Sequence, residues 1–403
     1  MSAAAPTAEP LAEALIVGAG PVGLYQAFQL GLQGIHAHIV DVLPMAGGQC
    51  AALYPAKLIH DIPALPPVTG LELTERLLAQ IRPFRPTFHL GHEVAGFEPV
   101  EAPSAAGGAS TAFRVSLQPV RPGSTSAAGS DTRRLDVQFV FIAAGVGAFQ
   151  PKPLRVPGLD AWLGRQVFQH RPDWLNAVVD GDTPWPEERG RHVVVYGADD
   201  DALDTVLALR PLAQAHPALR ISLVHRREPQ VDDIARLSAF RDACARGLLH
   251  FELGQPIAVR TAHDDAANAP ASSSASDPAP RGRLVALQLA DANDHLREIP
   301  ADVVLACQGL SPKLGPLAHW GLALERKQVP VDTARFATAL PGVYAVGDVN
   351  TYPGKRKLIA CGFHEAVLAG FDAAALLAGG PVPLEYTTSS AKLQQRLGVA
   401  PGR

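Results

Sequence analysis

The chain has 403 residues, of which 47% are hydrophobic and 18% charged, and its formal net charge is −4. This length is too great for a single small core, so we expect two domains, or one large domain with an insert. The slight negative charge and the ordinary composition argue against a polybasic nucleic-acid surface and against a disordered acidic tail. The composition is that of a globular enzyme that does not bind nucleic acid.

The first 13 residues are rich in Ala and Pro but lack the basic and apolar regions of a secretory signal. The longest apolar run, Phe139 to Phe149, is about half of the roughly 20 residues that a membrane-spanning helix needs. We therefore expect a cytoplasmic protein that does not enter a membrane.

The next segment predicts a strand, a glycine-rich turn, a helix and a second strand. Residues 14–18 form a short apolar run, residues 24–32 have helical periodicity, and residues 35–41 alternate like a strand. The turn between the first strand and the helix matches G-x-G-x-x-G. This order is typical of the βαβ unit that begins a dinucleotide-binding α/β domain.

Each glycine of this first turn has a physical role. Gly18 permits the tight turn, Gly20 lets the backbone approach a pyrophosphate, and Gly23 lets the helix pack close to the strand. The anion then lies on unpaired amides at the helix N-terminus. Pro21, which follows Gly20 and has no amide hydrogen to donate, is a further candidate contact. Asp41, at the end of the second strand, is placed to accept hydrogen bonds from a ribose diol. A glycine-rich turn can exist without a ligand, but here strand, glycines, helix and terminal acid agree.

Two further glycines follow the second strand. Gly47 and Gly48 remove side-chain bulk from a turn that a flavin could approach, and Gln49 could then hydrogen-bond the cofactor. Tyr54 precedes Pro55, which favours an extended segment that could hold the phenol ring against a flat cofactor face. Taken alone, Tyr54 would more often belong to a core.

Two regions are rich in Ala, Ser, Gly and Pro: residues 101–110 with 121–131, and residues 263–281. Each lies beside a strand-like run, so both are expected to be solvated hairpin loops that tolerate insertion. A partner-binding role is the alternative.

The order of strand, turn, helix and strand returns at residues 192–225. This second turn reads Gly197-Ala-Asp-Asp-Asp-Ala202 where G-x-G-x-x-A is expected, so the middle glycine is replaced by Asp199. A carboxylate there adds bulk and negative charge against a dianionic pyrophosphate, and binding should be weakened or rearranged. Gly197, Asp200 and Ala202 remain candidate contacts of a second nucleotide.

Two arginines at the end of the second strand of this unit favour a nucleotide. Arg226 and Arg227 lie at the position that faces the ribose, and guanidinium groups suit a 2′-phosphate. The alternative is a solvated strand end beside a vestigial site. The prediction that NADPH binds depends on the pattern of the whole unit more than on its glycines.

In their order along the chain, these motifs resemble those of the thioredoxin-reductase-like ferredoxin–NADP(+) reductases, a family of homodimeric flavoproteins. The resemblance runs from about Ala14 to the C-terminus. It is carried by Gly18 to Leu24, Gly47 to Pro55, Ile142 to Phe149, His225 to Arg227, Leu314 to Leu322 and Gly347 to Lys355.

The resemblance implies FAD contacts from both end regions of the chain. They are Asp41, Gln49, Tyr54, Val94, Phe149 and Asp348. It also implies a Thr at the reactive edge of the flavin. Thr388 matches this residue best, and Thr387 matches it if the register is shifted by one residue. Tyr386 would then cover the other flavin face. Tyr54, Tyr386 and Thr388 are accordingly the candidate catalytic residues.

The four cysteines separate related families. Cys50, Cys244, Cys307 and Cys361 are scattered, which argues against zinc, an iron–sulfur cluster or a local redox disulfide, and no metal site is expected. A thioredoxin reductase of this fold needs a C-x-x-C pair in its nucleotide domain, and none follows Ala202. Disulfide reduction by that route is excluded.

The resemblance divides the chain into an FAD-binding domain (residues 1–152 and 311–403) and an NADP(H)-binding domain (residues 153–310) inserted in it. It implies hydride exchange between NADPH and flavin, and single-electron exchange with ferredoxin or flavodoxin. Two alternatives stay open: an NAD(P)H diaphorase or quinone reductase on the same scaffold, and a non-catalytic flavin-binding protein with a degenerate NADP site. A homodimer follows from the resemblance alone.

Four basic residues could meet an acidic ferredoxin despite the negative net charge. They are Lys57, Lys355, Arg356 and Lys357. Alternatively, they are solvated surface residues.

Overall fold

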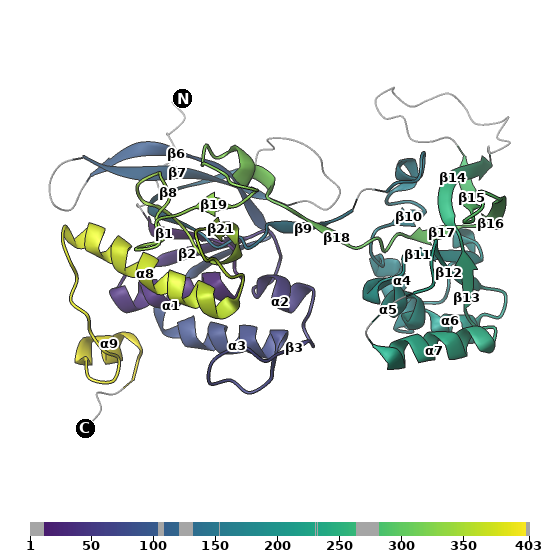
Figure 1. Ribbon diagram of the computed structural model, residues 1–403, viewed down its shortest axis with the longest axis horizontal. Coiled ribbons are helices and arrows are strands. Elements are labelled where there is room, and N and C mark those ends of the chain that lie inside the picture. The colour runs from purple at the N-terminus through teal and green to yellow at the C-terminus, as the bar shows by residue number, and fades with distance from the viewer. Residues whose placement is uncertain are drawn as a thin grey trace, which may run out of the picture. The chain divides into compact units, whose positions relative to one another are not determined.

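The computed structural model describes residues 12–103, 109–120, 132–152, 154–229, 231, 233–262 and 282–399. The chain divides into two compact units, one formed by residues 1–148 with 312–403 and the other by residues 149–311 (Figure 1). The second unit is therefore inserted into the first. Each unit has a sheet with parallel strands and packed helices, so the predicted two-domain α/β fold is confirmed. The assignment of FAD and NADP(H) to residues 1–152, 153–310 and 311–403 stays a prediction.

The first unit is built on a mixed sheet. Its strands are β1 (Ala12–Val17), β2 (Ala37–Asp41), β3 (Leu58–Ile59), β4 (Val68–Thr69), β5 (Thr87–Leu90), β6 (His92–Pro103), β7 (Ala109–Pro119), β8 (Arg133–Ile142), β19 (Val329–Pro330), β20 (Val343–Ala345) and β21 (Asn350–Thr351). The large sheet has the order β5-β2-β1-β8-β7-β6, and β20 also pairs with β8. β5, β2, β1, β8 and β20 are parallel, whereas β6 and β7 extend the sheet as an antiparallel hairpin.

Helices cover one face of this sheet. The helices of the unit are α1 (Pro21–Gln33), α2 (Gly48–Ala52), α3 (Gly70–Ile81), α8 (Ile359–Ala378) and α9 (Ala391–Arg396), with 3-10 turns η1 (Arg82–Phe84), η4 (Gly315–His319) and η5 (Gly347–Val349). Successive side chains of β1 point to opposite faces. Ile16 belongs to the core cluster under α1, α3 and α8, whereas Leu15 belongs to the cluster that includes Val115 and Trp320. A strand buried on both faces explains the uninterrupted apolar run at residues 14–17.

The second unit repeats this plan on a smaller scale. Its strands are β10 (Val167–Phe168), β11 (His192–Tyr196), β12 (Arg220–His225), β13 (His250–Leu253), β14 (Gln255–Ala262), β15 (Arg283–Ala290), β16 (Leu296–Pro300) and β17 (Val303–Leu305). Its helices are α4 (Asp173–Val179), α5 (Asp200–Ala208), α6 (Arg210–Ala215) and α7 (Ile234–Ala245), with 3-10 turns η2 (Asp160–Trp162) and η3 (Glu187–Arg189). A parallel sheet has the order β10-β17-β11-β12-β13, and β14-β15-β16 form a separate antiparallel sheet.

The chain passes between the units through two short strands, β9 (Ala148–Pro151) and β18 (Leu310–Lys313), which pair with each other. The loop expected at residues 101–110 is shorter than predicted, because β6 continues to Pro103 and β7 begins at Ala109. The pairing of β6 with β7 extends both strands into the segment that was expected to be a loop, and the composition of that segment did not predict this pairing. The loops expected at residues 121–131 and 263–281 lie outside the described residues.

Helix α8 is the only helix in the described part of the chain whose length and composition would suit a membrane span. Of its most apolar window, 39% is buried inside the protein, and the helix packs against α1. A search for an uninterrupted apolar run misses α8, because Glu365 and Asp372 interrupt it.

Candidate functional site

The first glycine-rich turn joins β1 to α1 and is packed too closely for side chains at two positions. A Cβ at Gly18 would collide with the main-chain oxygen of Ala143, and one at Gly23 would collide with the oxygen of Gly18. Gly18 also has φ +112°, in the region that favours glycine. These two glycines therefore bring α1 against the ends of β1 and β8, as their predicted roles require.

Gly20 differs from its neighbours because a Cβ there would meet no atom within 4 Å. It is the N-cap of α1, and no side chain caps this helix. Gly48 closes one side of the space, since a Cβ on Gly48 would lie 2.9 Å from the Cα of Gly20. No side chain therefore occupies the first-turn amides of α1, which can bind an anion, and the residues present fit the phosphate part of FAD.

Asp41 lies at the carboxyl end of β2, beside this turn. Its carboxylate accepts hydrogen bonds from the amides of Ala19 (2.6 Å) and Leu43 (2.9 Å). Burial raises the pKa of Asp41, and the two amides oppose that effect. The amides fix the orientation of the carboxylate, whose remaining lone pairs can accept hydrogen bonds from a ribose diol.

Asp348 comes from the far end of the sequence and joins the same site. It lies in η5, where a Cβ on Gly347 would be 3.3 Å from the side chain of Val22 in the first turn of α1. Burial raises the pKa of the Cys50 thiol in α2, and the negative charge of Asp348 raises it further. Asp348 therefore also lies near that helix. No described residue donates a hydrogen bond to the Asp348 carboxylate, and burial raises its pKa. A half-buried carboxylate without a donor fits a ligand that carries hydroxyl groups.

A buried carboxylate that the sequence analysis missed holds this segment in place. Glu365 of α8 is fully buried and accepts hydrogen bonds from the Gly347 amide (2.7 Å), the Asn350 amide group (2.8 Å) and the Tyr352 hydroxyl (2.9 Å). It also pairs with Lys355, whose side chain is only 7% exposed. The signal in the sequence was a single Glu within a long apolar helical segment.

The Lys355 pair corrects one prediction. Lys355 was expected on a surface that meets ferredoxin, but its ammonium group is committed to Glu365 and to the oxygen of Gly347 (2.9 Å). A basic residue in a loop was taken to be exposed because the sequence does not show its buried partner. Lys57, Arg356 and Lys357 are exposed.

Gln49 and Tyr54 lie at the two ends of the α2 segment. The Gln49 amide nitrogen would be 3.3 Å from a Cβ on Gly145, so its side chain extends over the loop that follows β8. Tyr54 is 51% exposed, with the Lys57 ammonium group 5.4 Å from its ring centroid. An exposed ring agrees better with a contact for a ligand or a partner than with a core position.

Two further predicted FAD contacts have less support from their side chains. Val94 is 3% exposed within the core cluster, so only its main chain is left for a ligand. Phe149 lies in β9, but its side chain is outside the described residues.

The structure does not bring the C-terminal candidates to this site within one chain. Tyr386, Thr387 and Thr388 are exposed in the loop before α9, and Gln394 of α9 donates to the oxygen of Thr387 (3.2 Å). Arg396 of α9 donates to Leu32, at the C-terminal end of α1. The phosphate turn lies at the opposite end of α1, about 20 Å away for a helix of this length (Figure 1).

The second turn joins β11 to α5 and has a different N-cap. Gly197 is as tightly packed as Gly18, since a Cβ there would collide with the main-chain oxygen of Cys307 and lie 2.8 Å from Ala202. Asp199 is the N-cap, and its carboxylate accepts a hydrogen bond from the amide of Ala202 (3.1 Å). The position that should be open to a pyrophosphate is therefore occupied by a side chain of the protein.

The other acidic residues of the second turn are also engaged. Asp200, a predicted nucleotide contact, pairs with Arg236 of α7 (2.9 Å), and Asp204 pairs with the same guanidinium (2.8 Å). Burial raises the pKa of Asp201, and the charge of Asp199 raises it further. Arg236 was missed in the sequence because it lies in another helix and outside any nucleotide motif.

Arg226 and Arg227 follow β12 and are exposed. Neither guanidinium forms an ion pair with any residue that the structure describes. Arg226 lies close enough to Tyr196, at the end of β11, to oppose the rise that burial causes in the pKa of that tyrosine. Both strand ends are at the carboxyl edge of the sheet, where a dinucleotide binds in this fold.

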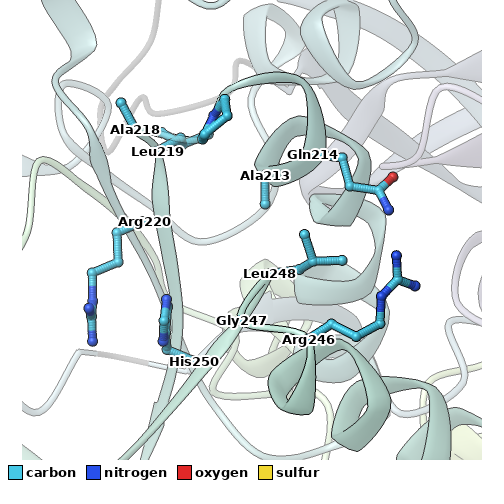
Figure 2. A pocket seen from close by; sticks show the side chains of 10 residues that line it. Ala213, Gln214, Ala218, Leu219, Arg220, Arg246, Gly247, Leu248 and His250 are labelled. Atoms are coloured by element: carbon cyan, nitrogen blue, oxygen red, sulfur yellow. The ribbon is translucent and has the colours of Figure 1, made fainter.

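A pocket of about 560 Å³ in the second unit lies at the opposite edge (Figure 2). Arg220 and His250, which begin β12 and β13, line it together with Gln214 and Arg246. It is separated from Arg226 by the full length of β12 and contains none of the predicted site residues.

Known proteins agree with this architecture. The model of the pyridine nucleotide-disulphide oxidoreductase family matches residues 12–367. Ferredoxin–NADP reductase of Paracidovorax citrulli (strain AAC00-1) is 46% identical over 398 residues, which cover 96% of each chain. The enzyme of the same name from Acidovorax sp. (strain JS42) is 46% identical over 395 residues, which cover 97% of each chain.

A solved structure shows the same fold. Thioredoxin reductase of T. acidophilum matches 91% of this chain and 98% of its own, with a TM-score of 0.52 and 20% identity. The family and the curated relatives imply FAD and NADPH as cofactors. The chain therefore belongs to the pyridine nucleotide-disulphide oxidoreductase family, in the group whose curated members are called ferredoxin–NADP reductases.

Proposed function

We propose that this chain is an FAD-dependent ferredoxin–NADP(+) reductase. The observation that carries the proposal is the uncapped first turn of α1, which lies between the fixed carboxylate of Asp41 and the unpartnered carboxylate of Asp348. The name of the curated relatives at 46% identity supports the choice of activity. When bound, FAD supplies hydride exchange with NADPH and single-electron exchange with ferredoxin or flavodoxin.

In this proposal the first unit binds and orients FAD. The amides at the N-terminus of α1 would bind the pyrophosphate. Gly20 and Gly48 leave room for it, Gly18 and Gly23 let the turn and the helix pack closely, and Pro21 begins the helix. Further contacts come from Asp41, Gln49, Tyr54, Asp348 and the main chains of Val94 and Phe149. The exposed ring of Tyr54 would pack on the flavin and exclude water from it.

The second unit holds NADPH. Arg226 and Arg227 bind the 2′-phosphate, since both are exposed at the carboxyl edge and free of ion pairs within the described residues. Gly197, Asp200 and Ala202 belong to the turn that faces the pyrophosphate. The pairing of Asp200 with Arg236 limits its part to shaping that turn.

Tyr386, Thr387 and Thr388 act at the flavin of a second copy in a homodimer. In one chain, Arg396 of α9 binds Leu32 near the C-terminal end of α1, and the phosphate turn lies at the other end of that helix, about 20 Å from Leu32. The exposed Leu376, Leu377 and Leu384 beside them supply apolar surface that a second copy would cover. Light scattering on the purified flavoprotein should give twice the mass of one chain.

Lys57, Arg356 and Lys357 form the cationic surface that receives an acidic ferredoxin or flavodoxin. The reaction takes place in the cytoplasm, with no membrane involved. A second candidate, a flavin-binding protein whose nucleotide domain no longer works, is favoured only by the Asp199 cap.

An anaerobic titration tests the proposed activity. NADPH should bleach the flavin absorbance of the oxidised protein, and the reduced protein should then reduce ferredoxin faster than a quinone. If dithionite bleaches the flavin and NADPH does not, the protein is not an NADPH-dependent reductase. A faster reaction with quinone would favour the diaphorase alternative.

A further inference from the structure

We propose that Asp199 is a built-in anion that occupies the second dinucleotide turn and must move from the Ala202 amide toward Lys152 before the pyrophosphate of NADPH can bind. The inference rests on the proposed NADPH binding and adds a residue that sets its affinity. It is carried by the hydrogen bond from Ala202 and by the position of Asp199 beside Gly309 and Lys152.

The first step concerns the amide that the carboxylate occupies. Ala202 is the third residue of α5 after the N-cap, as Gly23 is in α1. In α1 no side chain caps the helix, whereas in α5 the Ala202 amide donates to Asp199 (3.1 Å). A pyrophosphate would need the same donors at the N-terminus of α5. Carboxylate and ligand therefore compete for one position.

The second step concerns charge. Asp200 and Asp204 share the single guanidinium of Arg236, which also lies 3.9 Å from Asp233, so its one positive charge offsets only part of their negative charge. Asp199 makes no ion pair within the described residues. Two negative groups at one helix N-terminus repel each other, and because Asp199 is exposed, water screens part of that repulsion. Removal of the Asp199 charge should thus favour the ligand.

The third step identifies where the carboxylate can move. A Cβ on Gly309 would lie 3.3 Å from a carboxylate oxygen of Asp199 and 3.4 Å from the Lys152 ammonium nitrogen. Both groups therefore flank Gly309. The Lys152 amide donates to the oxygen of Gly309 (3.1 Å), which holds the Lys152 backbone beside the turn. Gly309 has φ +75° and leaves space between the two charges.

Calorimetric titration of the oxidised FAD-bound protein with NADP(+) tests the proposal, because NADP(+) binds without reducing the flavin. Asp199→Gly should tighten binding at least tenfold, since Gly is a tolerated N-cap and leaves the amide open. Asp199→Asn keeps the cap and removes the charge, so it should tighten binding by a smaller factor of about three. Circular dichroism checks that both variants fold.

A double-mutant cycle tests the part played by Lys152. Lys152→Met should weaken NADP(+) binding about tenfold in the native chain and less than twofold in the Asp199→Gly background. Equal losses in both backgrounds would mean that Lys152 contacts the ligand directly, and the movement toward it would be overturned. Arg226→Ala serves as the control that the ligand occupies this site, and should weaken binding in every background.

The outcomes separate this inference from the proposed function. If the native chain binds NADP(+) through Arg226 and Asp199→Gly binds no more tightly, the inference is wrong and the function stands. If only Asp199→Gly binds, the inference is supported and the native chain uses another electron donor. If neither protein binds, both are wrong.

Discussion

The two strand-to-helix turns of this protein, at residues 18–23 and 197–202, have the same local architecture but differ in their N-caps. Each follows a parallel strand, begins with a tightly packed glycine and leads into a helix. The N-cap of α1 is Gly20, which has open space beside it, whereas the N-cap of α5 is Asp199, whose carboxylate holds an amide of its own helix. The N-terminus of α5 therefore binds a side chain of the protein, whereas that of α1 has no side-chain cap.

The two turns also differ in how they are anchored. Near the first turn, Glu365 is fully buried and pairs with Lys355, which is 7% exposed. Near the second turn, Arg236 is 26% exposed and pairs with two carboxylates that are more than half exposed. Water screens the second network far more than the first, so equivalent substitutions should have unequal effects on stability.

The largest effect is expected for Glu365→Gln. This change removes the carboxylate that pairs with the buried Lys355 ammonium group and leaves the charge of Asp348 nearby, and removing one partner of a buried pair costs about 3–5 kcal/mol. The flavin should also dissociate more readily, because Glu365 holds the Gly347 amide next to Asp348. Thermal unfolding followed by flavin fluorescence measures both effects.

The double variant Glu365→Gln with Lys355→Met is the control for this prediction. It removes the unpaired charge and should recover much of the lost stability. A loss below about 1 kcal/mol in the single variant would show that water reaches Lys355, and the first anchor would then resemble the second.

Much of the first site could be predicted from the sequence because its signals are local. The order of strand, Gly18 to Gly23, helix and Asp41 fixed the turn and its acid partner within one βαβ unit. Glu365 and Arg236 could not be found in this way. Each acts on a segment from another part of the fold, and neither belongs to a motif. The separation of Thr388 from the phosphate turn depends on where α9 packs on α1, which spacing along the chain does not reveal.

The second site shows the limit of motif analysis in another way. Asp199 was predicted to oppose a pyrophosphate by its bulk and charge. Asp also happens to be a favourable N-cap, so the structure gives its carboxylate a stable position in the turn. The missing glycine could be read from the sequence. The competition between the Asp199 carboxylate and a pyrophosphate for the Ala202 amide could be inferred only from the structure, which shows the hydrogen bond between Ala202 and Asp199.

Gly20→Asp would give the first turn an acidic N-cap like Asp199 in the second turn. The backbone at Gly20 has φ −71°, and a Cβ there meets no atom within 4 Å, so the variant should fold. Its carboxylate would cap α1 and repel the pyrophosphate of FAD. We expect flavin affinity to fall about a hundredfold, equivalent to roughly 2.7 kcal/mol. The ratio of flavin to protein absorbance after dialysis measures the loss.

Gly20→Ala is the matched control, since it adds a Cβ without charge or capping ability. It should lose less flavin than Gly20→Asp. An equal loss of flavin in both variants would mean that side-chain bulk alone excludes the pyrophosphate. The effect of Asp199 in the second turn would then be attributed to its size and not to its charge or its capping hydrogen bond.

The smallest effect is expected for Arg236→Ala. Its ion pairs with Asp200 and Asp204 are largely solvated, and such pairs contribute about 0–1 kcal/mol. Unfolding of the second unit can be followed by tryptophan fluorescence, because Trp162, Trp174 and Trp185 all lie in that unit. A destabilisation of about 3 kcal/mol would instead place Arg236 in the same class as Glu365. The two turns would then differ less in their anchoring than in their N-caps.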